Sequence, residues 1–83
     1  MPRFFFHLHG GQDLSDEEGV LLDDLDAVRV QALKGARDIM ANEVKSGHLP
    51  LNESICVTDE QGAVVHRQRF PDAIVIVHES ESE

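Results

Sequence analysis

One long amphipathic segment dominates the pattern of apolar and polar positions. Its apolar residues recur at three- and four-residue steps: Leu25, Val28, Ala32, Leu33, Ala36, Ile39, Met40 and Val44. This spacing predicts a helix from Leu25 to Lys45 with one apolar face. Asp24 is the favoured N-cap, and Gly47 suits the left-handed position after the last turn. Gly35 lowers helix propensity, so we interpret it as a close approach to the sheet.

Alternating positions before the helix predict two strands. Over residues 3–9 one face carries Phe4, Phe6 and Leu8, and the other carries Phe5, His7 and His9. Residues 20–22 form a short apolar segment that we expect to pair with this first strand. The acidic stretch between them ends at Gly19, which can take the positive φ that closes a turn after Asp16.

The remainder of the chain is predicted to be β-structure. Residues 53–58 and 63–69 alternate around a turn at residues 59–62, which is typical of a hairpin. In the second of these strands, Val64, His66 and Gln68 share one face and Val65, Arg67 and Arg69 share the other. Residues 73–77 predict a final strand, with a helical turn at residues 72–74 as the open alternative.

Together these elements predict an α+β fold with an antiparallel sheet of four or five strands in ββαββ order. The one long helix packs on one face of this sheet, against Phe4, Phe6 and Leu8. Residues 1–77 are expected to form a single domain, and residues 78–83 an acidic flexible tail.

Charge and cysteine content narrow the classes of function. The 83 residues include 16 Asp and Glu against seven Lys and Arg, a net charge of −9, which argues against a nucleic-acid partner. Arg3, Arg67 and Arg69 can form a small positive spot that balances local carboxylates. Cys56 is the only cysteine, so no internal disulfide is possible, and we interpret it as a small, partly buried apolar residue. The N-terminal stretch is too short for a signal peptide or membrane span, so we expect a cytoplasmic protein without membrane contact.

Several short motifs together resemble a known family. They are MPRFFF at residues 1–6, DEEG at residues 16–19, DLDA at residues 24–27, DEQG at residues 59–62, and Phe70 followed by Asp72 and Ala73. The chain resembles, from Met1 to about Ile76, a family of short uncharacterised alphaproteobacterial proteins, a domain of unknown function. The resemblance implies a small cytoplasmic bacterial protein and supplies no catalytic residue. The apolar run at residues 74–78 and the acidic tail are less usual for the family.

The pair His7 and His9 is the sharpest chemical feature. Residues i and i+2 of a strand share a face, so the two imidazoles could share a metal if His66, His78 or a carboxylate supplied a third ligand. The alternative interpretation places both histidines on a half-exposed sheet face without metal. The acidic stretch at residues 13–18 lacks the alternating spacing of a calcium loop and is interpreted as a solvated turn. No catalytic group and no cofactor is predicted.

Phe5 cannot face the helix together with Phe4 and Phe6, so its ring needs another cover. A symmetric partner is the simplest cover for a small domain, which predicts a homodimer. Two functions follow. The favoured one is a non-catalytic protein-interaction or regulatory module that binds a protein partner through Phe5, His7 and His9. The alternative is a small metal-binding protein or metal-dependent enzyme that uses His7 and His9.

Overall fold

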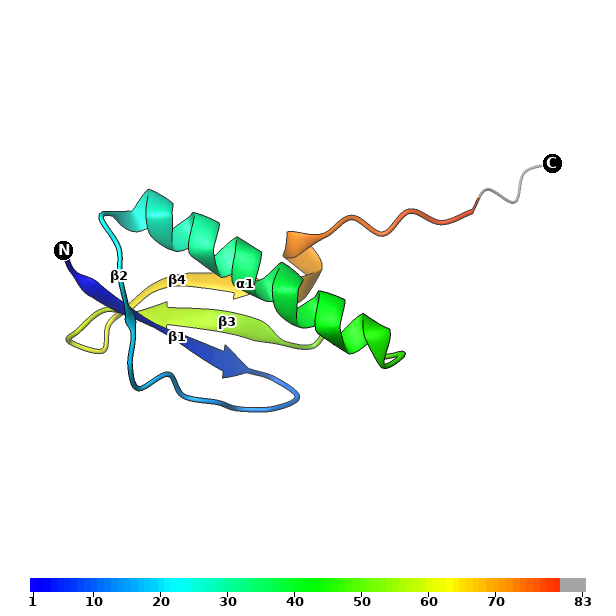
Figure 1. Cartoon of the computed structure of the whole chain (residues 1–83), viewed down its shortest axis with the longest axis horizontal. Helices are drawn as coiled ribbons and strands as arrows, with labels where there is room; N and C mark the ends of the chain where they lie inside the picture. The colour runs from blue at the N-terminus through cyan, green and yellow to red at the C-terminus, as the bar shows by residue number, and fades with distance from the viewer. Residues whose placement is uncertain (80–83) are drawn as a thin grey trace.

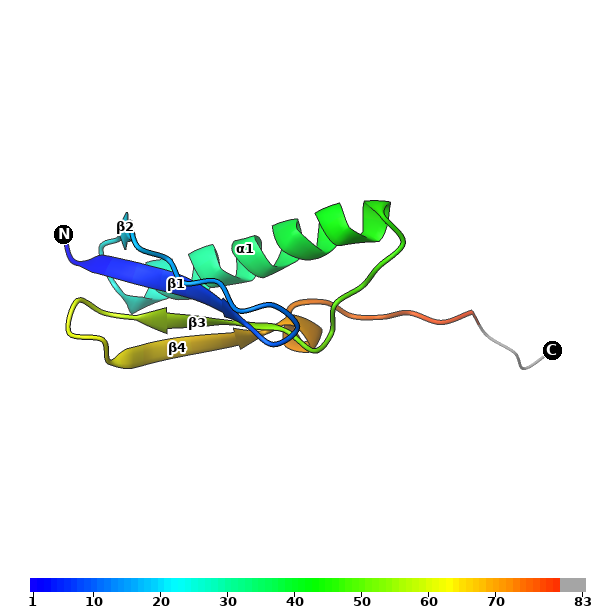
Figure 2. The same cartoon turned by 90° about the horizontal axis from the view of Figure 1, so that it is seen from below.

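Four strands and one long helix form two layers in a computed structural model that describes residues 1–79 (Figure 1). The elements are β1 (Arg3–His9), β2 (Val20–Leu21), α1 (Leu25–Lys45), β3 (Ser54–Thr58), β4 (Val64–Arg69) and the 3₁₀ helix η1 (Phe70–Ala73). The strands are antiparallel and lie in the order β2-β1-β3-β4, with α1 across one face (Figure 2). The predicted α+β class is confirmed, with four strands.

Both ends of α1 form as the sequence predicted. Asp24 Oδ1 accepts a hydrogen bond from the Ala27 backbone N–H at 2.9 Å, which satisfies one free donor of the first turn. At the other end Gly47 adopts φ +84°, and its N–H donates to the Val44 carbonyl at 2.8 Å. The helix therefore begins and ends where side-chain and glycine chemistry direct it.

The core lies between α1 and the sheet. Its buried residues are Phe4, Val28, Ala32, Ala36, Met40, Ile55, Val57, Phe70 and Ala73. Small residues on the helix face allow α1 to approach the sheet closely. Phe70 is fully buried although the sequence placed it in a break between elements. Its N–H donates to the Glu53 carbonyl at 3.0 Å, which holds η1 beneath the helix.

The helix lies mainly over β3, β4 and η1 rather than over β1. Phe6 and Leu8 point toward the helix as predicted, but they are only partly buried. The ends of the predicted apolar stripe are also exposed: Leu25 is 47% exposed and Val44 is 53% exposed. Length accounts for the exposure of Val44, because 21 helical residues span about 31 Å whereas seven strand residues span about 24 Å. The C-terminal end of the helix extends beyond the sheet (Figures 1 and 2).

The predicted strand at residues 73–77 is wrong. The chain forms η1 at Phe70–Ala73, and residues 74–79 have no secondary structure. Arg37 Nε donates to the Ala73 carbonyl at 2.8 Å, which ties the chain to α1 and turns it away from the sheet. Figures 1 and 2 both show the following segment leaving the body of the domain. The rest of the predicted tail, residues 80–83, lies outside the described residues.

Two smaller predictions also need correction. The second strand ends at Leu21 rather than Leu22, although the Leu22 N–H still donates to the Pro2 carbonyl at 3.1 Å. A register shift between Val57 and Thr58 interrupts the pairing of β3 with β4. Val65 therefore packs against the core instead of sharing the outer face with the two arginines of its strand.

Replacing Gly35 by Ala is expected to raise the free energy of unfolding by about 0.5 to 1 kcal/mol. A Cβ at Gly35 would lie 3.4 Å from Ile55 Cδ1, an ordinary contact, so the helix gains propensity without a clash. Urea unfolding followed by circular dichroism measures the change. Gly47→Ala is the matched control and should be destabilised, because its φ of +84° strains any side chain. A less stable Gly35→Ala variant would show that the helix cannot approach the sheet with a methyl group in place.

Candidate functional site

The sheet face that α1 does not cover, called the open face below, brings the sequence-predicted site residues together. It carries Arg3, Phe5, His7 and His9 from β1, Ser54, Cys56 and Thr58 from β3, and Arg67 and Arg69 from β4. Direct cross-strand pairing places them in rows, with His7 beside Cys56 and Cys56 beside Arg67. Cys56 is buried within its row, as expected of a small apolar residue.

Phe5 is partly covered by its own chain. Its ring stacks against His7, with centroids 6.5 Å apart and planes 13° apart. On its other side the backbone of Gly19 approaches so closely that a Cβ there would lie 2.9 Å from Phe5 Cε2. Gly19 adopts φ +74°, so the position requires glycine for both conformation and space. The sequence analysis assigned the whole cover of Phe5 to a partner, whereas residues 16–19 supply part of it.

Both ring nitrogens of His7 are engaged in the fold. The Asp16 backbone N–H donates to His7 Nδ1 at 3.1 Å, and His7 Nε2 lies 3.0 Å from Thr58 Oγ1. Since Nδ1 accepts a hydrogen bond, the neutral ring carries its proton on Nε2 and donates it to the hydroxyl. His7 therefore has no free lone pair to offer a metal, and its role is to connect β1 with the neighbouring loop and strand.

Asp16 is a structural residue that the sequence analysis missed. Its Oδ2 accepts from the Phe6 backbone N–H at 3.0 Å, and its Oδ1 accepts from the N–H groups of Glu18 and Gly19, each at 3.1 Å. The expectation of a solvated turn is therefore wrong at this residue. The D-x-x-G spacing to Gly19 was the available signal, because an Asp side chain at that position commonly binds the backbone of its own turn.

These contacts set the acidity of Asp16. Partial burial raises the pKa of its carboxyl, but the backbone N–H donors of Phe6, Gly19 and Glu18 lower it more, and a protonated His7 lowers it further. The net pKa lies below the ordinary value for Asp. At neutral pH the group is therefore an ionised acceptor whose oxygens are occupied by backbone donors, which leaves it unsuited to proton transfer.

Three other histidines were considered as metal ligands. The ring of His9 lies on the same face as that of His7, with centroids 6.4 Å apart and planes tilted by 51°, whereas His78 is exposed in the segment after η1. His9 is half-exposed, and its Nδ1 lies 3.6 Å from Asp13 Oδ1. His66 pairs with Val57 on the helix side of the sheet, so its ring is on the opposite face from His7. Its Nε2 is buried and has no hydrogen-bond partner among the described residues. Within residues 1–79 no three His, Cys, Asp or Glu side chains are grouped as a metal site.

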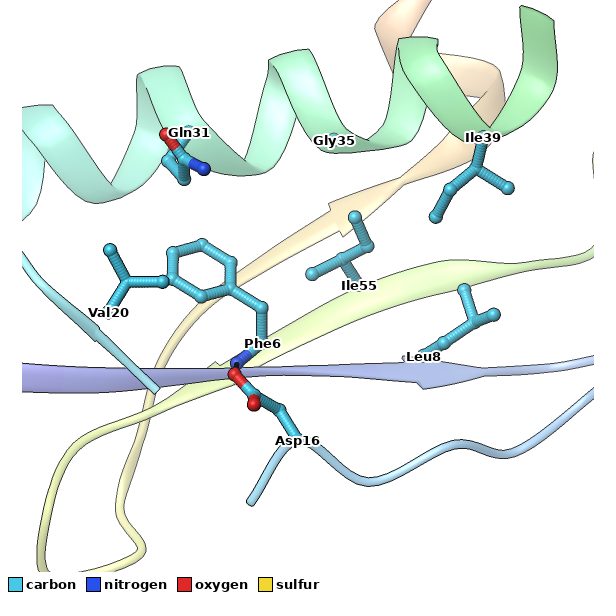
Figure 3. A pocket seen from close by; sticks show the side chains of 8 residues that line it. All are labelled: Phe6, Leu8, Asp16, Val20, Gln31, Gly35, Ile39 and Ile55. Atoms are coloured by element: carbon cyan, nitrogen blue, oxygen red, sulfur yellow. Dashed lines mark hydrogen bonds between the residues drawn. The ribbon is translucent and has the colours of Figure 1, made fainter. Parts of the chain in front are cut away.

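An apolar hollow of about 220 Å³ lies between α1 and β1, where the helix leans away from the sheet (Figure 3). It is lined by Phe6, Leu8, Asp16, Val20, Gln31, Gly35, Ile39 and Ile55. Its only ionisable side chain is Asp16, whose oxygens are already bonded to backbone N–H groups. The hollow thus presents shape and apolar surface without a pair of groups for acid–base chemistry.

The open face differs in charge from the rest of this acidic chain. The seven residues of β1, the five of β3 and the six of β4 include no Asp or Glu, although 16 of the 83 residues are acidic. Arg3 donates to the Glu18 carbonyl at 2.7 Å, and Arg69 lies 3.4 Å from Asp72. The side chain of Arg67 makes no hydrogen bond or ion pair with another residue of the described chain. The expected balancing by carboxylates therefore applies to Arg69 alone.

The comparisons with known proteins give a family and nothing more. The family model described as Domain of unknown function (DUF6894) matches residues 3–71. No curated protein and no solved structure matches the chain. No helix within residues 1–79 has the length and apolar character needed to cross a bilayer.

Removing the charge of Asp16 is expected to lower the free energy of unfolding at neutral pH. The free energy of unfolding should also depend less on pH in the acid range. The pKa of Asp16 in the folded state lies below its ordinary value. The ionised carboxylate therefore stabilises the fold at pH values above the unfolded-state pKa of about 3.9. This stabilisation is lost as the pH falls through the folded-state pKa. Asp16→Asn should lose about 1 to 2 kcal/mol of unfolding free energy at pH 7, the range for a capping side chain. Denaturant titrations between neutral and acid pH measure both effects.

Glu17→Gln is the control, because it removes the same charge from an exposed position of the same turn. This variant should keep the neutral stability of the parent protein. Equal losses in the two variants would show that net charge, rather than the contacts of the Asp16 carboxylate, determines the effect.

Proposed function

Since the chain belongs to the family Domain of unknown function (DUF6894), whose description names no activity, we propose from its surface that it is a non-catalytic protein-interaction module. The single observation that carries this proposal is the open face. No element among the described residues covers it, and its strands hold arginine, histidine and phenylalanine without any acidic residue. Aromatic and arginine side chains are enriched where proteins bind one another.

The charge of the open face selects the kind of partner. Arg67 is exposed and has no carboxylate partner in the described part of the chain, whereas Arg69 lies near Asp72 and His9 near Asp13. An acidic protein surface fits this face, because complementary charge favours association and like charge opposes it. A second copy of the chain offers acidic side chains outside this face as such a surface, and this local complementarity has to outweigh the repulsion between two copies that each carry a net charge of −9. The proposal is therefore a homodimer in which Phe5, His7 and His9 lie at or near the contact.

The cellular setting belongs to the same proposal. The resemblance to alphaproteobacterial proteins and the single buried cysteine support a bacterial cytoplasmic protein. A reducing compartment leaves a thiol such as Cys56 unpaired without consequence for the fold. The proposed module thus needs no disulfide and no cofactor, and it is stabilised by its core and by association.

Reversing the charge of Arg67 should weaken the homodimer. Sedimentation velocity over a range of micromolar concentrations measures the dissociation constant, and we expect Arg67→Glu to raise it roughly tenfold or more. Arg29→Glu is the control, because it makes the same change on the exposed side of α1, away from the open face. A protein that stays monomeric throughout the range would contradict the homodimer. Equal effects of the two variants would show that the contact does not lie on the open face.

The metal-dependent alternative is tested directly by zinc. We expect calorimetric titration with Zn²⁺ to give no stoichiometric binding at His7 and His9, because both nitrogens of His7 are engaged by Asp16 and Thr58. His48→Ala serves as the control for weak binding by an exposed histidine. Stoichiometric zinc that is lost in His9→Ala but kept in His48→Ala would establish the metal-binding alternative instead.

A further inference from the structure

We infer that residues 74–79 of one protomer, called the C-terminal segment below, pair with β4 of a second copy as an additional strand. The inference rests on the proposed homodimer but places its contact at the edge of β4, beside Arg67 and Arg69, whereas Phe5, His7 and His9 lie on β1, two strands further in. Two protomers related by a twofold axis would exchange these segments reciprocally, so each sheet would gain a fifth strand from its partner. The strand that the sequence predicted at residues 73–77 would then form only between chains.

The first observation is the exposure of apolar side chains in the C-terminal segment. Val75 and Val77 are each 86% exposed and Ile76 is 49% exposed. Four consecutive β-branched residues, Ile74 to Val77, are strongly suited to a strand. Figures 1 and 2 show the segment extending away from the domain, and Ile74 at its start is the residue that packs against the core of its own chain. Pairing with another strand would bury these apolar side chains and give hydrogen bonds to the backbone of the segment.

The second observation is that, within residues 1–79, the edge of the sheet at β4 has no neighbour, whereas the edge at β1 is occupied. On the β1 side, β2 pairs with Phe4, Leu14 pairs with Leu8, and Asp16 accepts from Phe6, so this edge is occupied. On the other side β4 pairs with β3 alone and is the last strand of the sheet. A last strand presents a row of free N–H and C=O groups, which is a template for one more strand.

The segment is poorly placed to fill this edge within its own chain. Phe70 and Ala73 are fully buried beneath α1, and the Ala73 carbonyl accepts from Arg37 Nε. The residues that would have to reverse the chain are thus fixed on the helix side of the sheet. From there the C-terminal segment continues beyond the end of β4 rather than back along it (Figure 2). A second copy running in the opposite direction meets it along its length.

The charges favour the C-terminal segment of a second copy, rather than its open face, as the partner of this surface. Stacking two open faces would set Arg67 and Arg69 of one copy against those of the other. In an extended C-terminal segment, Glu79 shares a side with Val75 and Val77, whereas the isoleucines point to the opposite side. Pairing beside β4 with the isoleucines toward the helix layer therefore brings a carboxylate to the arginine side of the sheet, and Glu81 and Glu83 follow in the sequence.

The test removes backbone donors from the segment without changing its apolar character. In the full chain, Val75→Pro with Val77→Pro eliminates two N–H groups, and Val75→Thr with Val77→Thr is the matched control that keeps them and the branched shape. Both positions are exposed, so the unfolding curve of the monomer should not move. We expect the proline variant to raise the dimer dissociation constant at least roughly tenfold and the threonine variant to remain a dimer.

Amide hydrogen exchange by NMR, recorded above and below the dissociation constant, provides a second measurement. The N–H groups of the C-terminal segment and the outward-facing N–H groups of β4 should gain protection together, and only at the higher concentration. A dimer that the proline variant leaves intact, but Arg67→Glu disrupts, would overturn this inference and keep the proposed function. Protection of the segment in a monomer would show that it folds back on its own sheet, and a monomer without protection would overturn both proposals.

Discussion

The carboxylate of Asp16 is the contact on which the arrangement of the sheet depends. The first strand has a two-residue neighbour on one side, so the N–H of Phe6 would otherwise face solvent at an open edge. Asp16 supplies an acceptor there, and its other oxygen binds the two N–H groups that shape the turn toward Gly19. The same turn covers Phe5 and engages His7. One ionised side chain thus closes an edge, shapes a loop and orients the central residues of the open face.

The position of α1 over the sheet leaves the remaining surface features. One helix does not cover all four strands, and here it lies over β3 and β4 rather than over β1. The hollow beside Phe6 and Leu8 is what remains on the β1 side. Because its only carboxylate is already bonded to backbone groups, this hollow has the shape of a pocket without the chemistry of an active site.

The proposed association rests on two features of the surface. The open face has the composition of a contact surface, and β4 offers the sheet's open edge. These two features adjoin at Arg67 and Arg69, so a partner that pairs with the edge also reaches the positive charges. In the proposed module the fold would position backbone groups and a few charged side chains, and the partner would supply the additional strand and the opposite charge.

Local chemistry in the sequence determined most of the elements. The spacing of apolar residues, the Asp24 cap and Gly47 defined α1 to the residue, and alternation assigned Phe5, His7 and His9 to one face of β1. Only the tertiary structure decided what each side chain contacts. The burial of Phe70, the engagement of both His7 nitrogens and the bond from the Phe6 N–H to Asp16 depend on residues that are separated along the chain, which periodicity does not encode. Residues 74–77 have the composition of a strand, but a strand also needs a neighbouring strand to pair with. The turn η1, which Arg37 holds against α1, directs these residues away from the sheet.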